Sequence, residues 1–216
     1  MREKIIANTL EKKLIAIVRG LEPEQIIDLG KALYAGGINM IEVTFNQSST
    51  DHYAATTKAI AALKQELGDK ILVGAGTVLS KEQVDLAKTA GASYIITPTV
   101  NTEVIRYANA LGMVTMPGAL TPSEIVEAYE AGADFVKVFP AGEMGTSYIK
   151  AIKAPLNHIR MLAVGGVNEK NIKDFLKAGV AGFGVGGNLV NKEWINNGEF
   201  EKITALAKEF VKAVQE

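Results

Sequence analysis

The sequence predicts one α/β domain over residues 1–216, folded as a single (β/α)8 or TIM barrel. Eight short apolar runs, rich in β-branched residues, recur at a fairly even pace, which is typical of strands that are covered on both faces. Stretches with helical periodicity separate these runs, and 216 residues suffice for one compact barrel.

The strand candidates follow one another as LIAIVRG from Leu14, MIEVTF from Met40, KILVGAGTV from Lys70, YIITPTV from Tyr94, MVTMPGAL from Met113, FVKVFPA from Phe135, IRMLAVGGV from Ile159 and GFGVGGNLV from Gly182. The rival architecture is an open, doubly wound sheet. We favour the barrel because of the number of strands and because no run leads into a complete G-x-G-x-x-G motif. The segment GAGTVL at 74–79 lacks the third glycine.

Capping residues and glycines mark the predicted helix boundaries. Ser80 is a good N-cap and has Gln83 three positions on, which predicts a helix start there. Ala-Gly pairs within residues 35–37, 90–92, 131–133 and 178–180 each precede a strand candidate. Glycine at these places suits the left-handed residue that ends a helix.

The two terminal segments predict further helices. Apolar residues from Phe200 to Val214 share one helical face, so we expect this segment to pack against the barrel. We expect the residues before Leu14 to form a short helix that covers one end of the barrel.

Composition limits the function classes. The formal net charge of −1 does not favour a nucleic-acid partner, and no apolar run approaches the roughly 20 residues that span a bilayer. The chain has no cysteine and two histidines, so we expect no disulfide, metal or cofactor site. The N-terminus is charged and does not resemble a signal peptide, so we expect a cytoplasmic protein.

Two charged residues stand inside strand candidates. Barrel enzymes carry their active sites at the C-terminal ends of the strands, so polar residues late in each run are the candidates. Strand alternation puts Glu42 on the face opposite the apolar residues Ile41 and Val43, and thus inside the barrel. Alternation alone does not say which face of the sixth strand, with Lys137, is inward.

Lys137 and Glu42 admit two interpretations. They are either a buried structural ion pair, which is costly unless its geometry is excellent, or a catalytic pair. In the catalytic reading, burial lowers the pKa of the lysine, so that a neutral amine attacks a carbonyl while the carboxylate moves protons. We favour the catalytic reading because both groups lie late in their strands.

Glycine pairs end the seventh and eighth strand candidates. Gly165-Gly166 and Gly186-Gly187, the second followed by Asn188, predict a phosphate site made of backbone N–H groups. The alternative is that these glycines only form tight turns. Arg19, at the end of the first run, is a candidate partner for a substrate carboxylate or phosphate, or a salt-bridge residue.

The series LIAIVRG, IEVTF, VGAGTV, ITP, MPG, VKVFPA, VGGV and VGG resembles the family of 2-keto-3-deoxy-6-phosphogluconate (KDPG) and 4-hydroxy-2-oxoglutarate (KHG) aldolases, which includes the phosphogalactonate enzymes. The resemblance covers nearly the whole chain, with the strand ends in family order. It implies a metal-independent class I aldolase, typically a homotrimer.

The resemblance also implies roles for individual residues. Lys137 would form the Schiff base with pyruvate or the keto acid, and Glu42 would be the general acid and base. Thr77 would contact the pyruvoyl end, with Pro98 and Phe139 shaping the pocket around it. The phosphate would bind at Gly165, Gly166, Gly187 and Asn188.

Two departures from the family pattern bear on the substrate. Gluconate-specific members have an arginine where this chain has Asn46, whereas the galactonate branch has asparagine there and an arginine at the place of Arg19. A serine usually stands at the place of Asn188.

We therefore expect cleavage of 2-keto-3-deoxy-6-phosphogluconate to pyruvate and glyceraldehyde 3-phosphate, and of 4-hydroxy-2-oxoglutarate to pyruvate and glyoxylate. The alternatives are a 2-keto-3-deoxy-6-phosphogalactonate aldolase, a phosphate-binding barrel isomerase or synthase, and a non-catalytic oligomeric barrel.

Overall fold

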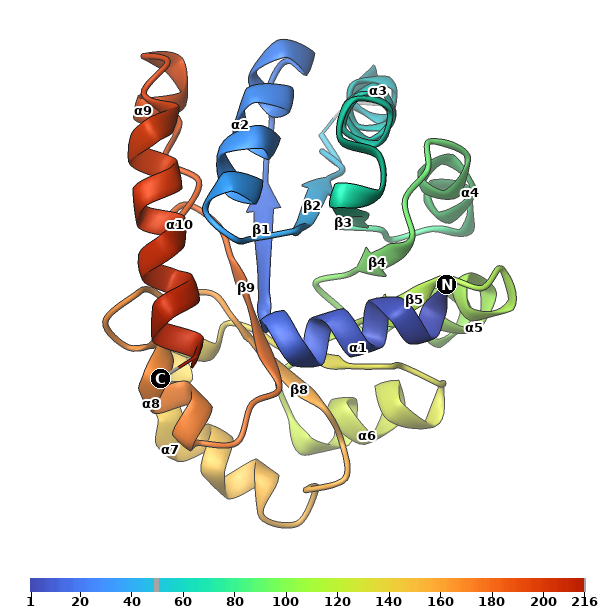
Figure 1. The fold of residues 1–216 in the computed structure, drawn as a ribbon. Helices are drawn as coiled ribbons and strands as arrows, with labels where there is room; N and C mark the ends of the chain where they lie inside the picture. The colour runs from blue at the N-terminus through green and yellow to red at the C-terminus, as the bar shows by residue number, and fades with distance from the viewer. Residues whose placement is uncertain (49–50, 216) are drawn as a thin grey trace.

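A parallel sheet with strand order β5-β4-β3-β2-β1-β9-β8-β7-β6 forms the centre of the computed structural model, which describes residues 1–48 and 51–215. Helices surround this sheet as a ring (Figure 1). The strands are β1 (Leu14–Val18), β2 (Met40–Thr44), β3 (Leu72–Gly76), β4 (Tyr94–Ile96), β5 (Val114–Met116), β6 (Gly118–Ala119), β7 (Val136–Val138), β8 (Met161–Val164) and β9 (Gly182–Val185).

The helices are α1 (Arg2–Lys12), α2 (Pro23–Ala35), α3 (Asp51–Leu67), the 3-10 turn η1 (Gly68–Lys70), α4 (Lys81–Thr89), α5 (Thr102–Ala110), α6 (Pro122–Glu130), α7 (Ala141–Lys153), α8 (Ile172–Lys177), α9 (Lys192–Asn196) and α10 (Phe200–Gln215). Each predicted apolar run supplies one barrel strand, so the predicted α/β TIM-like barrel is confirmed. None of the helices within the described residues is long and apolar enough to cross a bilayer.

The fifth barrel strand is interrupted at Pro117, which splits it into β5 and β6. Proline has no N–H to give to a sheet. Its carbonyl still accepts a hydrogen bond of 2.8 Å from the Lys137 N–H, and the Ala119 carbonyl accepts one of 3.1 Å from the Phe139 N–H. Since β5 pairs with β4 and β6 with β7, these bonds close the sheet on itself.

The helix signals in the sequence are confirmed. Ser80 Oγ accepts a 3.2 Å hydrogen bond from the Gln83 N–H, and the Gln83 side chain accepts one of 2.6 Å from the Leu79 N–H. Gly91, Gly132 and Gly179 have left-handed backbones with φ of 101°, 98° and 97°. In the first segment the left-handed residue is Gly37, with φ of 92°, whereas Gly36 is right-handed.

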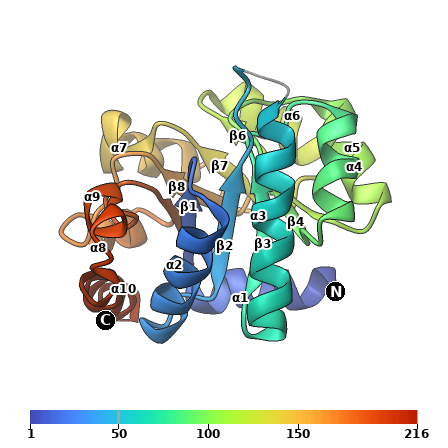
Figure 2. The same ribbon diagram turned by 90° about the horizontal axis from the view of Figure 1, so that it is seen from above.

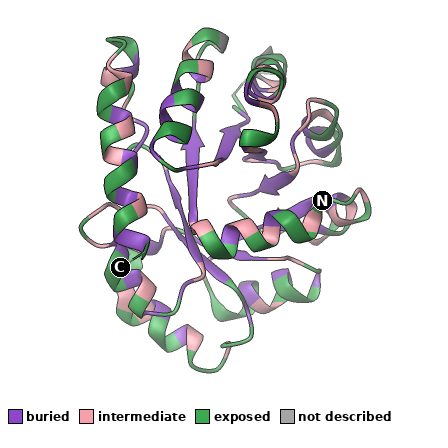
Figure 3. Cartoon of the chain, viewed as in Figure 1, coloured by how far each residue is buried: buried purple, intermediate pink, exposed green. Residues whose placement is uncertain are grey.

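Two apolar layers hold the barrel together. The larger layer lies between strands and helices, and its members include Ile41, Val43 and Phe45 of the β2 region. The second fills the barrel interior with Ile15, Ile17, Met40, Tyr94, Ile96, Val114, Met116, Phe135, Leu162 and Val164. Figure 3 shows the buried strands at the centre and the exposed outer faces of the helices.

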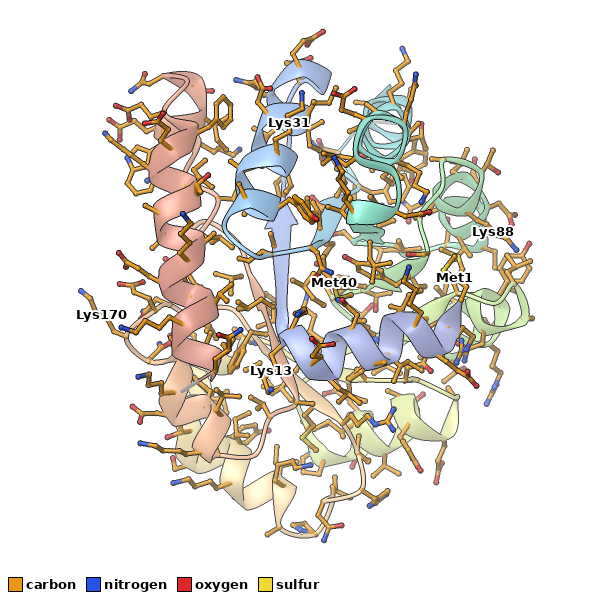
Figure 4. The ribbon with its side chains drawn as sticks, viewed as in Figure 1. Met1, Lys13, Lys31, Met40, Lys88 and Lys170 are labelled. Atoms are coloured by element: carbon orange, nitrogen blue, oxygen red, sulfur yellow. The ribbon has the colours of Figure 1, made fainter. Side chains whose placement is uncertain are left out.

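Helix α1 closes the N-terminal end of the barrel, as predicted (Figures 1 and 2). Ile5 of α1 belongs to the interior apolar layer, and the Thr9 hydroxyl lies 3.4 Å from the sulfur of Met40, which Figure 4 labels beside α1. Arg2 forms an ion pair of 2.6 Å with Asp134 and so ties α1 to the residue two positions before β7.

Helix α10 completes the outer ring beside α2, and its apolar face is buried as predicted. The Thr204 hydroxyl donates a 3.0 Å hydrogen bond to the Ala32 carbonyl. A Cβ on Gly36 would lie 2.4 Å from the Cβ of Ala207, so glycine at 36 permits the close approach of the two helices.

Candidate active site

The barrel interior holds one lysine and one glutamate near the C-terminal ends of the strands. Lys137 is the middle residue of β7 and is 4% exposed, and Glu42 of β2 is 1% exposed. Val136 and Val138 face the helices whereas Phe135 lies in the interior layer, so strand alternation turns Lys137 inward. The structure thus answers which face of this strand is inward.

Burial changes the proton affinity of both groups. It lowers the pKa of the Lys137 ammonium, an effect that the negative charge of Glu42 opposes and the positive charge of Arg19 reinforces. Burial raises the pKa of the Glu42 carboxyl, which the charges of Lys137 and Arg19 oppose. A lysine that readily loses its proton beside a carboxyl that readily keeps one is an arrangement suited to nucleophilic and general acid–base chemistry.

The geometry does not favour the structural ion-pair interpretation. Among the described residues, Lys137 and Glu42 are not joined in a direct ion pair, and the buried Glu42 Oε2 has no hydrogen-bond partner. A stabilising buried pair needs close contact and satisfied oxygens, because an unsatisfied buried oxygen is costly. Lys137 and Glu42 therefore do not form a satisfied structural ion pair.

A glycine of the neighbouring strand makes room for the glutamate. A Cβ on Gly76 would lie 1.7 Å from Oε1 of Glu42 and 2.5 Å from its Cδ. The space that glycine leaves within GAGTVL was not predicted from the sequence. Glycine on every second position of a strand was the missed signal, because these positions share one face.

A cavity of about 360 Å³ opens above Lys137 at this end of the barrel. Seven of the predicted site residues line it, namely Arg19, Lys137, Phe139, Gly165, Gly166, Gly187 and Asn188. The Lys137 Nζ lies 4.9 Å from the centre of the Phe139 ring, which is 40% exposed at the mouth. The structure thus brings together the lysine, its aromatic neighbour and both glycine loops.

The loop after β8 has two successive residues with left-handed φ. Gly165 and Gly166 both have positive φ, of 88° and 72°. Their carbonyls accept hydrogen bonds from the Gly142 N–H at 2.7 Å and from the Asn171 amide at 2.9 Å. The N–H groups of Gly165, Gly166 and Gly187 donate to no partner in the described protein and so remain for a ligand.

Two further contacts position these loops. A Cβ on Gly142, the second residue of α7, would lie 2.7 Å from the Gly166 Cα, so glycine at 142 is required for this packing, and we did not predict it. The Asn188 amide donates a 2.8 Å hydrogen bond to the Val167 carbonyl and links the loops after β8 and β9. One of its two amide hydrogens is thus already used.

Other predicted site residues lie outside the Lys137 cavity. Asn46 and Thr77 line a neighbouring cavity of about 850 Å³, and exposed Arg19 lines both. The Asn46 side-chain oxygen accepts hydrogen bonds from the Ser48 N–H at 3.0 Å and hydroxyl at 2.8 Å. The buried Glu42 lines neither cavity, and neither does Pro98, which lies against Gly118.

Thr77 has an unusual backbone. Its φ is 56°, a left-handed conformation that a β-branched residue rarely adopts. Its carbonyl accepts a 2.9 Å hydrogen bond from the Gln47 amide, which stabilises this conformation. Strained residues of this kind concentrate at functional sites, so Thr77 stays a candidate for substrate contact.

Comparisons with known proteins show which family the chain resembles. The family model "KDPG and KHG aldolase" matches residues 5–206. The chain is 39% identical over 204 residues to the 2-dehydro-3-deoxy-6-phosphogalactonate aldolase of Escherichia coli K12, covering 94% of this chain and 95% of that protein. It is 34% identical over 212 residues to the 2-dehydro-3-deoxy-phosphogluconate aldolase of Treponema pallidum, covering 97% of both.

A solved structure of similar fold holds a reaction intermediate. The KDPG aldolase of Legionella pneumophila, with pyruvate captured at low pH as a covalent carbinolamine, superposes with a TM-score of 0.84. The sequences are 30% identical, and the match covers 94% of this chain and 96% of that one.

Proposed function

Because the chain belongs to the KDPG and KHG aldolase family of carbon–carbon lyases, we propose that it is a class I aldolase whose Schiff base forms at Lys137. Its substrate is a 2-keto-3-deoxy-6-phospho sugar acid, which it cleaves to pyruvate and glyceraldehyde 3-phosphate. The observation that carries this proposal is that Lys137 and Glu42 are both buried and influence each other electrostatically, while Oε2 of Glu42 has no hydrogen-bond partner.

Schiff-base formation uses both groups. The neutral Lys137 amine attacks the C2 carbonyl carbon, and the proton that its nitrogen then loses passes to the carbonyl oxygen to give a carbinolamine. Glu42, as general acid, protonates the leaving hydroxyl, and water departs to leave the iminium. Burial raises the pKa of Glu42, and this direction supports a role as proton donor in this step.

Carbon–carbon cleavage then uses the iminium as an electron sink. Glu42, now ionised, takes the proton of the C4 hydroxyl, and the C3–C4 bond breaks as its electron pair forms the enamine. Glyceraldehyde 3-phosphate leaves, the enamine is protonated at C3, and water releases pyruvate from the lysine. No cofactor or metal is needed, because the protonated imine supplies the electrophile.

The glycine loops bind the substrate phosphate in this proposal. The unpaired N–H groups of Gly165, Gly166 and Gly187 are suited to phosphate oxygens, and Asn188 has one amide hydrogen left to donate. Phe139 covers the pyruvoyl group beside Lys137. We also propose that 4-hydroxy-2-oxoglutarate is a second substrate, that the enzyme is a cytoplasmic homotrimer, and that residues 1–216 act as one domain.

Two observations favour the galactonate over the gluconate epimer, which is the reverse of our first expectation. The galactonate enzyme of Escherichia coli is 39% identical, against 34% for the Treponema pallidum gluconate enzyme. Arg19 lines the Lys137 cavity whereas Asn46 does not, which supports Arg19 as the carboxylate partner that the resemblance to the galactonate branch implies.

The test measures pyruvate release by the purified protein from both phosphorylated epimers, from their unphosphorylated forms and from 4-hydroxy-2-oxoglutarate. We expect kcat/KM to be highest for the phosphogalactonate and at least about tenfold lower without the phosphate. Faster cleavage of the phosphogluconate would reverse the epimer assignment. Absence of cleavage of every substrate would contradict the aldolase proposal and favour an isomerase, a synthase or a non-catalytic barrel.

A further inference from the structure

One buried polar group near the site has no task in the reaction described above. The hydroxyl of Tyr94, the first residue of β4, is fully buried and has no hydrogen-bond partner. In the described part of the chain, only one other buried side-chain polar atom lacks a partner, and it is Oε2 of Glu42. Buried polar groups are nearly always paired, so two unpaired ones in one barrel interior require an explanation.

The register of the sheet brings these two side chains together. Glu42 of β2 is paired with Gly74 of β3, and Gly74 is paired in turn with Tyr94 of β4. The residue between them has no side chain. Glu42 and Tyr94 therefore occupy the same register level on the two strands that flank β3, and the Tyr94 ring fills the space that a side chain at Gly74 would take.

Both side chains lean onto the inner face of β3. A Cβ on Gly74 would lie 2.4 Å from Cζ of Tyr94, the ring atom that carries the hydroxyl. A Cβ on Gly76 would lie 1.7 Å from Oε1 of Glu42. Residues two apart on a strand are separated by about 6.6 Å, so the phenol and the carboxylate lie over neighbouring positions of one strand.

We propose that Tyr94 is a positioning residue for this reaction: its hydroxyl donates a hydrogen bond to the Glu42 carboxylate, through one water molecule or after a small side-chain rotation. The inference rests on the proposed role of Glu42 as the group that moves protons. It adds a residue from β4 to a site otherwise built from β2, β7 and the loops.

The electrostatics agree with a donor role. Burial and the charge of Glu42 raise the pKa of Tyr94 well above its ordinary value, so the phenol keeps its proton. The other charged groups that face Glu42 are Lys137 of β7 and Arg19 after β1. A neutral donor stabilises the ionised carboxylate and opposes the effect of burial, which raises the pKa of Glu42.

The test replaces Tyr94 with phenylalanine, which keeps the ring over Gly74 and removes only the hydroxyl. The carboxyl C=O infrared band of Glu42, assigned by its loss in Glu42→Gln, is titrated in the wild type and in Tyr94→Phe. We expect this band to titrate about one pH unit higher in Tyr94→Phe, because a hydrogen-bond donor to the charged form is lost. A band that titrates at the wild-type pH would overturn the inference, whether or not the protein cleaves the tested sugar acids.

Turnover gives a second, independent readout. Tyr94→Phe should lower kcat about tenfold, and should add less than about twofold to the loss already caused by Glu42→Gln, since Tyr94 acts through Glu42. An equal loss in both backgrounds would instead show a packing role. Tyr148→Phe is the matched control: its hydroxyl donates a 2.6 Å hydrogen bond to the Leu120 carbonyl, away from Glu42, and its removal should leave the band unmoved.

Discussion

The two ends of the barrel interior differ in what their inward-facing residues do. At the N-terminal end, Met40 and Phe135 are fully apolar neighbours that α1 covers with Ile5. At the C-terminal end, Glu42 and Lys137 follow them two residues later on the same strands and the same face. Two residues further along, an apolar side chain that stabilises the fold is thus replaced by a buried charge that costs stability and to which we assign the chemistry.

The largest expected effect is a loss of turnover caused by a change at the C-terminal end of the barrel interior. Lys137→Met should lower turnover about 10⁴-fold or more while the protein stays folded, because the nucleophile is lost and its buried charge is removed. Steady-state kinetics and thermal unfolding measure this.

Lys153→Met is the matched control for that variant. Lys153 donates hydrogen bonds to the carbonyls of Asn157 at 3.0 Å and Ile159 at 2.9 Å. Its replacement should cost about 1 kcal/mol of stability and leave turnover within about twofold. A comparable loss of turnover in Lys153→Met would show that the loss in Lys137→Met is not specific to the C-terminal end of the barrel interior.

The next largest effect is on stability, at the N-terminal end of the barrel that α1 covers. Phe135→Ala should lower the free energy of unfolding by about 3–5 kcal/mol, because Phe135 is 1% exposed and its removal leaves a cavity in the interior layer. Urea unfolding gives this value. Turnover per folded molecule should stay near that of the wild type. A loss of turnover as large as that of Lys137→Met would contradict the proposed difference between the two ends of the barrel.

A double variant tests whether the charged end costs stability. Glu42→Leu with Lys137→Met should raise the free energy of unfolding at pH 7 by about 1–4 kcal/mol and abolish turnover. The exposed pair Lys31–Glu66, whose charges lie 3.1 Å apart, provides the control: the same two changes there should alter stability by less than about 0.5 kcal/mol. A destabilised double variant would favour the ion-pair interpretation.

The difference in free energy of unfolding between the double variant and the wild type should depend on pH, because the pKa values of Glu42 and Lys137 are both shifted. The pKa of Glu42 is raised, so its stabilising contribution is full below the unfolded pKa and is lost as pH rises through the folded value. The pKa of Lys137 is lowered, so its contribution is full above the unfolded pKa and is lost as pH falls through the folded value. Between the folded-state pKa values of Glu42 and Lys137, both groups therefore lower the stability of the wild type. The double variant lacks both groups, so its free energy of unfolding should vary less with pH.

The smallest expected effect concerns the phosphate loop of the open end. Gly166→Ala places a Cβ at a backbone φ of 72° and 2.9 Å from the Gly142 Cα, so the loop must shift. We expect KM for the phosphorylated substrate to rise about tenfold and KM for the unphosphorylated acid to change little. Equal changes in KM for both substrates would contradict a role of this loop in phosphate binding.

Sequence periodicity predicted the fold well because each strand signal is local. Every apolar run became a strand, and Ser80 caps α4 as its spacing with Gln83 indicates. The inward direction of Lys137 could not be derived from alternation, since both faces of a barrel strand are buried. Proximity across strands also escaped prediction: Asn46, two residues after β2, lines a different cavity from Lys137 within β7.

Glycines were the least well interpreted residues. Those that end helices were predicted from their place after an alanine. Gly76 and Gly142 were missed because their role depends on a side chain or loop from another strand that needs their space. Tyr94 escaped for the same reason, since an aromatic residue in an apolar run gives no local sign of a polar neighbour.

The most direct test of Lys137 as the Schiff-base nucleophile is reduction with borohydride in the presence of pyruvate, followed by peptide mapping. The account predicts one added pyruvate-derived mass per chain, on the peptide that contains Lys137, and none in Lys137→Met. An adduct on another lysine, or none in the wild type, would contradict it.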